Sequence, residues 1–330
     1  MPEAATLFKE WSGYLKPEDL ARIETAYDFS KNAHNGQFRA SGDPYISHPL
    51  AVANILAQLH LDSQALTAAL LHDVMEDTEV TKAEISKKFG KPVAELVDGV
   101  SKLDRIEFET KEEAQAENFR KMLLAMARDV RVILIKLADR LHNMRTIASL
   151  PQAKQTRIAQ ETLDIYAPLA NRLGISWIKQ ELEDLCLRHM HPDVYYKLAQ
   201  RVAKKKTERD KYIEEVAGIL SEKLKEYDIH GTVTGRAKHL YSIFKKMERR
   251  KVDFDQVYDV MAFRIVVDNI TECYKALGVI HSVYKPVPGR FKDYIGLPKP
   301  NGYQSLHTAV IGRHRPIEVQ IRTAEMHQVA

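Results

Sequence analysis

The stretch ALTAALLHDVMED, residues 65–77, decides how the first half of the chain folds. Its apolar residues recur at helical spacing and lead into an adjacent His72–Asp73 pair. If the helix continues, His72 shares a face with Glu76, and Asp73 shares a face with Asp77, because residues four apart lie one turn from each other. Two carboxylates on one face repel unless a cation lies nearby. The stretch therefore predicts a helix that leads into a cation site.

Neighbouring segments carry the same helical spacing. LAVANILAQL (50–59) and ETLDIYAPLANRL (161–173) both repeat apolar residues every three or four positions. VRVILIKLAD (130–139) is ambiguous because its β-branched residues suit a strand, but its helical neighbours favour a helix. We predict an all-α bundle over residues 1–195 and a charged amphipathic linking helix over 196–228.

The pattern changes after Gly231. VYDVMAFRIVVD (257–268), HTAVIG (307–312) and PIEVQIRT (316–323) have the composition and alternation of strands. They are separated by a helical segment over 238–250 and by a loop rich in Pro and Gly over 285–305. The sequence predicts a mixed α/β domain over residues 229–330.

Composition narrows the class of protein. The chain has 330 residues, enough for about two cores, and no apolar run long enough to cross a bilayer. With two distant cysteines and no secretory signal pattern, we expect a cytoplasmic protein without a disulfide scaffold. Residues 1–195 carry a net charge of −5 and residues 196–330 carry +9. A basic half attracts polyanions such as nucleotide phosphates, anionic lipid or nucleic acid.

In the first half, side chains that could bind a metal or act in catalysis lie in four short segments: around His48, at residues 72–77, at residues 138–140 and at residues 142–146. The predicted ligands of a buried divalent ion are His48, His72, Asp73 and Asp139. Two imidazoles and two carboxylates suit a borderline-hard ion such as Mn²⁺, with positions left for water and a phosphate oxygen. Glu76 is placed to orient or deprotonate that water. Asn143 and Thr146 lie four and seven residues after Asp139 and would present polar groups to a substrate.

Each of these features also has a plainer interpretation. An adjacent His-Asp pair is common by chance, and only its context favours a metal. The basic run KKKTERDK (204–211) is typical of a solvated helix face, and no aromatic residues interleave it as in nucleic-acid binding proteins, so we expect no DNA partner.

These motifs, taken together and in order, resemble a known family. FRASGDPYISHP (38–49), ALLHDVMEDT (69–78), VSKLDR (100–105) and IKLADRLHNMRT (135–146) resemble the HD-type hydrolase domain of the RelA/SpoT homologues, which make and destroy (p)ppGpp. GRAKHLYSIFKKM (235–247), GRFKDYI (289–295), PKPNGYQSLHT (298–308) and EVQIRT (318–323) are similar to the synthetase domain. The hydrolase stretch is most similar to SpoT-type members.

The resemblance implies a Mn²⁺-dependent (p)ppGpp 3′-pyrophosphohydrolase that acts in the stringent response. It implies the same four metal ligands, and it makes Glu76 and Asp77 the acidic pair that acts on the hydrolytic water. Arg39 would stack on guanine, as a planar guanidinium can. Asn143 and Thr146 would contact the nucleoside. The products would be GDP or GTP and pyrophosphate.

For the second half, the resemblance implies pyrophosphoryl transfer from ATP to GDP or GTP. Asp259 would hold Mg²⁺, and Glu318 would share that task or activate the attacking hydroxyl. Tyr303 would stack on guanine. Arg236, Lys238 and Lys246 would bind the ATP phosphates. The other residues implied in substrate binding are Arg290, Lys292, Lys299, Asn301, Gln304 and His307.

The residues themselves add to this expectation. Alternation in PIEVQIRT predicts that Glu318, Gln320 and Arg322 share a polar face, while the intervening apolar residues face a core. A lone strand Glu usually faces solvent, but one or two carboxylates plus substrate phosphates suffice for Mg²⁺. Tyr303 could equally be a tyrosine that packs a loop.

Other features separate subclasses of the family. Arg290 and Lys292 match the basic version of the RFKD segment in bifunctional and SpoT-type members, so a dedicated synthetase is not expected. The resemblance also implies a catalytic fragment, whose full-length relatives are regulated through later domains, by acyl carrier protein among others. We expect a hydrolase with a weak, silent or regulatory synthetase domain. The alternatives are a balanced bifunctional enzyme and a domain that senses guanine nucleotides without turnover.

Overall fold

The computed structural model describes residues 4–104, 129–204, 206–237, 239–251, 261–299, 302–312 and 315–329. The chain divides into two compact units, Met1–Tyr166 and Ala167–Ala330. The functional boundaries expected at residues 195 and 228 stay predictions.

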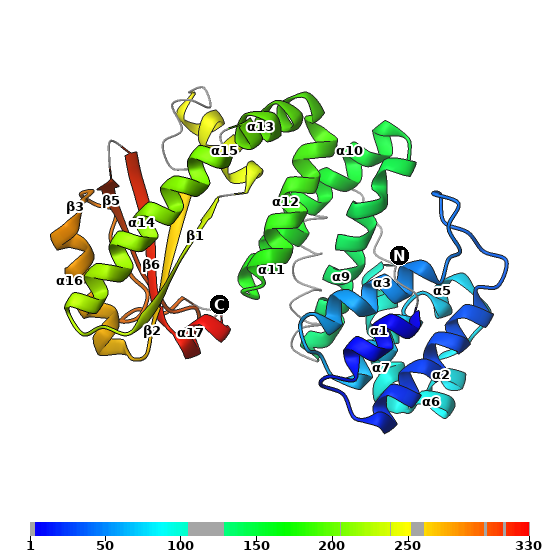
Figure 1. Ribbon diagram of the computed structural model, residues 1–330. Coiled ribbons are helices and arrows are strands. Elements are labelled where there is room, and N and C mark those ends of the chain that lie inside the picture. Colours follow the sequence, from blue (N-terminus) through cyan, green and yellow to red (C-terminus); the bar gives the residue numbers. More distant parts are fainter. Residues whose placement is uncertain are drawn as a thin grey trace. The chain divides into compact units, whose positions relative to one another are not determined.

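All regular secondary structure described in the first unit is helical, apart from an isolated β-bridge between Phe38 and Pro44 (Figure 1). Its helices are α1 (Ala4–Trp11), α2 (Pro17–Ala33), α3 (Ser47–Ala57), α4 (Ser63–Leu71), α5 (Val74–Asp77), α6 (Lys82–Phe89), α7 (Lys91–Asp104), α9 (Val130–Thr146) and α10 (Gln152–Glu161), with a 3-10 turn at Ile147–Ser149 and a π-helical turn at Thr162–Tyr166. The helix expected over 130–139 is confirmed as part of α9.

Helix α4 lies at the centre of this unit. Every residue from Ala65 to Leu71 is buried, so the helix is apolar on all sides and must be surrounded. It packs against α2, α3, α7 and α9. The Asp62 side chain accepts a hydrogen bond from the backbone N–H of Ala65 and so caps its first turn. The central position of α4 brings its C-terminal His72 to the middle of the unit.

The second unit combines helices with a mixed sheet (Figure 1). Its helices are α11 (Ala167–Arg172), α12 (Ser176–Met190), α13 (Pro192–Lys204), α14 (Lys206–Glu226), α15 (Leu240–Arg250), α16 (Ile270–Val283) and α17 (Ala324–Val329). Its strands are β1 (Gly231–Ala237), β2 (Met261–Val267), β3 (Lys285–Pro286), β4 (Lys292–Asp293), β5 (Leu306–Gly312) and β6 (Arg315–Thr323).

The strands form one sheet in the order β1-β2-β6-β5-β3, and β4 pairs with β5. Only the central pair β2–β6 is parallel; the other pairs are antiparallel. Helices α14 and α16 cover one face, where Leu220 and Ile280 join Phe263, Val319 and Ile321 in the core. The opposite face of β5 and β6 therefore carries the polar side chains that alternate with this core.

Three local expectations needed revision. Residues 196–228 form parts of two helices, α13 and α14, where one linking helix was expected. The predicted loop over 285–305 contains two short strands, β3 and β4. Strand β1 was not foreseen, because Gly231 and Gly235 weaken the strand preference of its Thr and Val residues, and pairing with β2 along its whole length overrides that weakness.

Candidate active sites

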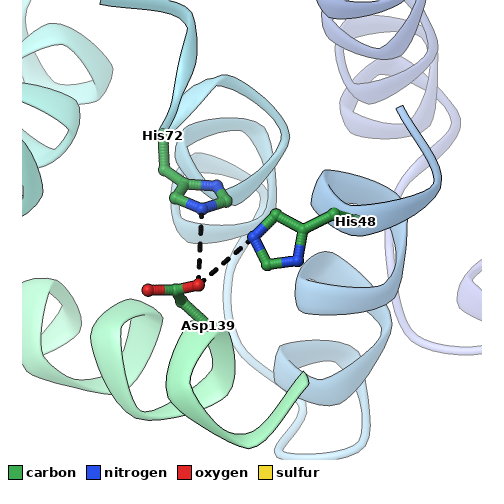
Figure 2. A group of neighbouring side chains, drawn as sticks. All are labelled: His48, His72 and Asp139. Atoms are coloured by element: carbon green, nitrogen blue, oxygen red, sulfur yellow. Dashed lines mark ion pairs between the residues drawn. The ribbon is translucent and has the colours of Figure 1, made fainter. Parts of the chain in front are cut away.

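A buried cluster of three potential metal ligands lies in the first unit (Figure 2). His48 lies in the first turn of α3, His72 directly follows α4, and Asp139 lies in the middle of α9. Their ligand atoms lie within 4.8 Å of one another, and His48 Nε2 is 3.2 Å from Asp139 Oδ1. The three residues are at most 5% exposed. Three helices distant in sequence thus direct two imidazoles and one carboxylate to a single point.

The tautomer of His72 suits metal binding. Its Nδ1 lies 2.8 Å from the backbone carbonyl of Ala69, to which the ring donates. In the neutral ring that bond leaves the lone pair on Nε2, as in ligating histidines that donate through their other nitrogen. Nε2 is buried without a hydrogen-bond partner among the described residues. A buried polar atom of this kind is costly unless something binds it, so the site fits a cation.

Asp73, the fourth expected ligand, borders the cluster. Its Oδ1 lies 3.0 Å from His72 Nε2, and its Oδ2 lies 3.5 Å from His48 Nε2. The two carboxylates and two imidazoles therefore surround the same point, and this donor set suits Mn²⁺ and similar divalent ions.

Asp139 is held as a buried anion. Burial opposes its charge, but Lys136 and the hydrogen bond with His48 outweigh burial and hold the pKa of Asp139 well below its usual range. Lys136 Nζ lies 2.8 Å from Asp139 Oδ2, and Asn143 donates to Oδ1 at 2.6 Å. Burial lowers the pKa of His48 and favours its neutral form. The cluster is ready to accept a positive ion.

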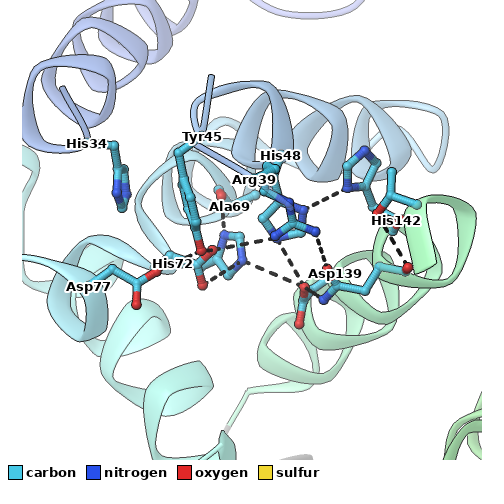
Figure 3. Close-up of polar contacts among 12 residues, drawn as sticks. His34, Arg39, Tyr45, His48, Ala69, His72, Asp77, Asp139 and His142 are labelled. Atoms are coloured by element: carbon cyan, nitrogen blue, oxygen red, sulfur yellow. Dashed lines mark hydrogen bonds and ion pairs between the residues drawn. The ribbon is translucent and has the colours of Figure 1, made fainter. Parts of the chain in front are cut away.

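Tyr45 joins the cluster to the acidic helix α5. Its hydroxyl lies 2.9 Å from Asp73 Oδ2 and 2.7 Å from Asp77 Oδ2, which confirms that these carboxylates share a face (Figure 3). One hydroxyl proton can serve only one of the two oxygens at a time. A cation bound by Asp73 would leave the hydroxyl proton for Asp77, which is also exposed to water. The ring of Tyr45 stacks on His34 at 4.5 Å, which fixes its position.

Glu76 and Asp77 lie on α5 beside this cluster and are exposed. The chain departs from regular helix at His72 and Asp73, between α4 and α5, although the backbone N–H of Asp77 still donates to the carbonyl of Asp73. The continuous helix expected from the sequence is therefore interrupted, yet the four-residue spacing of Asp73 and Asp77 survives.

A pocket of about 470 Å³ opens beside the cluster. Arg39, Asn143 and Thr146, the expected nucleoside contacts, all line it together with Asp139. Arg39 donates to the Asn143 side-chain carbonyl at 2.7 Å. The Thr146 hydroxyl donates to the backbone carbonyl of His142, so it can offer a lone pair to a ligand donor. The structure thus brings these three residues together at one opening.

His142 lies behind the cluster. Its Nδ1 is 2.7 Å from Nδ1 of His48, and both rings are buried (Figure 3). Burial, with the neighbouring charges of His48, Arg39 and Arg145, lowers the pKa of His142 to about 3.

A second group of polar residues lies on the open face of the sheet in the second unit. Tyr303 Oη is 2.8 Å from His307 Nε2, and His307 Nδ1 is 4.0 Å from Glu318 Oε1. Burial, only partly offset by Glu318, lowers the pKa of His307 to about 4. Glu318 and Gln320 are partly exposed, as the alternation predicted. Arg322 is only 3% exposed, but its guanidinium lies 5.9 Å from the ring centre of Tyr303 and so belongs to the same polar group.

Basic residues surround this second group. Lys299 Nζ lies 4.7 Å from the ring centres of both Tyr294 and Tyr303. Lys292 pairs with His307 across β4 and β5, and Gln304 donates to the backbone carbonyl of Ile295. Arg290 is exposed and Lys246 is half-buried on α15. Lys238, Asp259 and Asn301 lie outside the described residues, as does the side chain of Arg236, so the expected Asp259–Glu318 pair stays a prediction.

Sequence reasoning missed three residues of the first site: Tyr45, Lys136 and His142. Lys136 had a usable signal, because a Lys three residues before a helical Asp lies on the same face. His142 follows Asp139 at the same spacing. Tyr45 had none, since its partners lie 28 and 32 residues away in sequence.

Comparison with known families defines the class of each region. Residues 26–176 match the model described as "HD domain", and residues 235–330 match the model described as "Region found in RelA / SpoT proteins". The cluster of His48, His72 and Asp139 lies within the first match, and the group around His307 lies within the second. The chain therefore contains an HD domain followed by a RelA/SpoT-type domain.

Three curated relatives extend this result. A Myxococcus xanthus protein named GTP pyrophosphokinase is 54% identical over 97% of this chain and 43% of its own length. A Haemophilus influenzae protein named guanosine-3′,5′-bis(diphosphate) 3′-pyrophosphohydrolase is 55% identical over 91% of this chain and 45% of its own. An Escherichia coli protein named bifunctional (p)ppGpp synthase/hydrolase SpoT is 53% identical over 96% and 45%.

With both domains present in order, the chain belongs to the RelA/SpoT family. It spans less than half the length of these three relatives. Among the residues that the structure describes, no helix is both long and apolar enough to span a membrane.

Proposed function

We propose that the first unit is a Mn²⁺-dependent hydrolase that removes the 3′-diphosphate of (p)ppGpp and yields GDP or GTP and pyrophosphate. One observation carries the proposal: His48, His72 and Asp139 meet in the buried cluster, beside a pocket lined by Arg39 and Asn143. A buried donor set next to a nucleotide-sized opening is what metal-assisted phosphoryl hydrolysis requires.

Different residues would bind the ion and activate the attacking water. His48, His72, Asp73 and Asp139 would hold the ion, which supplies positive charge at the phosphoryl group when bound. Glu76 and Asp77 would orient the attacking water and accept its proton as its oxygen bonds to phosphorus. The bond from that phosphorus to the ribose 3′ oxygen then breaks, and the oxygen leaves with a proton.

Nucleoside recognition would use the mouth of the pocket. The Arg39 guanidinium, 5.7 Å from the ring centre of Tyr45, would cover the face of guanine. Asn143 and the Thr146 lone pair offer hydrogen bonds to the nucleoside. The pocket volume of about 470 Å³ lies in the ordinary range for small-ligand sites.

The second candidate is a bifunctional enzyme in which the sheet domain also transfers pyrophosphate from ATP to GDP or GTP. The observation in its favour is the arrangement of Tyr303, His307 and Glu318 on one open sheet face, with Lys299 beside the tyrosine. Glu318 would work with Asp259 and Mg²⁺. If this group binds nucleotide without turnover, the domain is a sensor instead.

Guanine nucleotides are thus the proposed partners, with ATP added if the second domain is active. Neither unit needs DNA or a membrane for these activities. Cytoplasmic location, a role in the stringent response and regulation of the full-length protein by acyl carrier protein are proposals of the same kind.

Two assays on one preparation test these alternatives. The first follows ppGpp with Mn²⁺ or with EDTA, and the second follows ATP plus GDP with Mg²⁺. Hydrolysis that requires Mn²⁺, is lost in Asp73→Asn and is kept in Asp259→Asn would support the hydrolase. Synthesis at a comparable rate would favour the bifunctional enzyme, and no turnover in either assay would contradict both.

A further inference from the structure

His142 and His48 share one hydrogen bond between like nitrogens. Nδ1 of each ring lies 2.7 Å from Nδ1 of the other (Figure 3). At this distance one nitrogen must carry the proton and the other must present a lone pair. The opposite nitrogen of His48, Nε2, faces Asp139 Oδ1 at 3.2 Å. Which ring donates in the shared hydrogen bond therefore decides whether Nε2 of His48 presents a proton or a lone pair to the cluster.

Only one arrangement leaves His48 able to bind a metal. A ligating Nε2 has no proton, so the neutral His48 ring must carry its proton on Nδ1 and donate it to His142. His142 must then accept at Nδ1 and carry its own proton on Nε2. If His142 instead donates from Nδ1, His48 must carry its proton on Nε2, where it can donate to Asp139 and cannot bind an ion.

We propose that His142 is a positioning residue for the metal centre, and that metal binding exchanges the tautomers of the His48–His142 pair. Without the ion, the shared proton lies on His142 Nδ1 and His48 donates from Nε2 to Asp139. With the ion, the shared proton lies on His48 Nδ1, the Nε2 proton of His48 is released and a proton is taken up at His142 Nε2. Each ring keeps one proton throughout, so both stay neutral.

The position of His142 on α9 supports this role. It lies three residues after Asp139, so one helix face supplies both a metal ligand and the acceptor for a second ligand. Its backbone carbonyl accepts from Thr146, which lines the pocket. His142 is 8% exposed, so the lone pair that it offers to His48 lies in a buried setting where water is a poor substitute.

Nitrogen NMR of the ring nuclei observes the exchange directly. The full chain, labelled with ¹⁵N at histidine, is compared without metal and with Zn²⁺, a diamagnetic probe of the same donor set. We expect His142 to carry its proton on Nε2 in the Zn²⁺-bound protein and on Nδ1 without it. A His142 that keeps a proton on Nδ1 when Zn²⁺ is bound would overturn the proposal.

A nearly isosteric pair of variants separates hydrogen bonding from packing. His142→Asn retains an acceptor near the position of Nδ1, whereas His142→Leu has a similar size and no acceptor. We expect Mn²⁺ affinity, measured by calorimetry, to fall about 10- to 100-fold in His142→Leu, with most of it retained in His142→Asn. Equal losses, or no loss, would overturn the proposal. His60→Gln, which removes an exposed imidazole of the same unit, is the control.

The inference rests on the proposed metal-dependent function, yet the two fail in different ways. If the protein hydrolyses ppGpp and binds Mn²⁺ but His142→Leu binds it as tightly, only the inference fails. If Zn²⁺ exchanges the tautomers but ppGpp is not hydrolysed, only the function fails. A wild-type protein that binds neither ion at this cluster overturns both.

Discussion

The polar cluster of the first unit and the polar group of the second unit differ in how deeply their side chains are buried. In the first unit, ligand atoms of His48, His72 and Asp139 converge within 4.8 Å in the interior. In the second, Glu318 is partly exposed on an open sheet face, 4.0 Å from His307. Buried charged groups must be compensated, whereas a half-exposed carboxylate can rely on water. The first group is therefore suited to bind a cation, while the second is compatible with several roles.

Removing a ligand from the buried cluster should have the largest effect. Asp139→Asn takes away one proposed metal ligand and the anionic partner of Lys136. We expect Mn²⁺-dependent ppGpp hydrolysis to fall at least about 10³-fold, because the ion loses a charged ligand. Any ATP-dependent synthesis should be unchanged.

Asp164→Asn is the matched control, because Asp164 is an exposed carboxylate of the same unit. If the Asp139→Asn protein hydrolyses ppGpp as fast as this control, the buried cluster is not needed for hydrolysis. The contrast drawn between the buried cluster and the group around His307 would then fail.

Lys136→Met tests whether a bound ion and the Lys136 ammonium compensate the same buried anion, the carboxylate of Asp139. Breaking a buried ion pair leaves an uncompensated charge, and we expect the first unit to lose about 3–5 kcal/mol of unfolding free energy without metal. Saturating Mn²⁺ should restore part of that loss. Urea unfolding with and without the ion measures both. Lys82→Met breaks a partly exposed pair with Asp98, which keeps Lys102 as a partner, so it should cost less than about 1 kcal/mol and respond little to Mn²⁺.

In the second unit, His307 provides a test through pH. Its pKa of about 4 in the folded chain lies below the ordinary 6.5. Between those values the unfolded chain takes up a proton that the folded chain does not, so stability falls as pH drops from 6.5 to 4 and is unaffected above.

Wild type should therefore lose about 2–3 kcal/mol more than His307→Gln between pH 7.5 and pH 4. Urea unfolding followed by hydrogen exchange in β5 and β6 measures the difference. Identical pH dependence in both proteins would mean that this group is as hydrated as its open face suggests.

Tyr45→Phe should give the smallest change. It removes the hydroxyl that contacts Asp73 and Asp77 and keeps the ring on His34. We expect kcat for hydrolysis to fall about 10-fold, while KM for ppGpp and Mn²⁺ affinity change little. Steady-state kinetics and calorimetry separate these terms. An equal loss in Mn²⁺ affinity would instead assign Tyr45 to the metal centre itself.

Much of the first unit could be predicted from the sequence, because the helical spacing of apolar residues indicates the helices and the His72–Asp73 pair indicates the candidate site. Burial of α4 on every side followed from its apolar composition, and the strands β2, β5 and β6 followed from alternation. Tyr45 and His142 escaped prediction as site residues because their roles depend on contacts between segments that lie 28 to 94 residues apart in sequence. Strand β1 escaped because its pairing with β2 outweighs its composition.

The most direct test is anomalous scattering at the manganese edge from crystals grown with Mn²⁺. We predict one strong peak among His48 Nε2, His72 Nε2, Asp139 Oδ1 and the Asp73 carboxylate, with no comparable peak in crystals treated with chelator. A site without such a peak at saturating Mn²⁺, or a peak only elsewhere on the chain, would contradict this prediction.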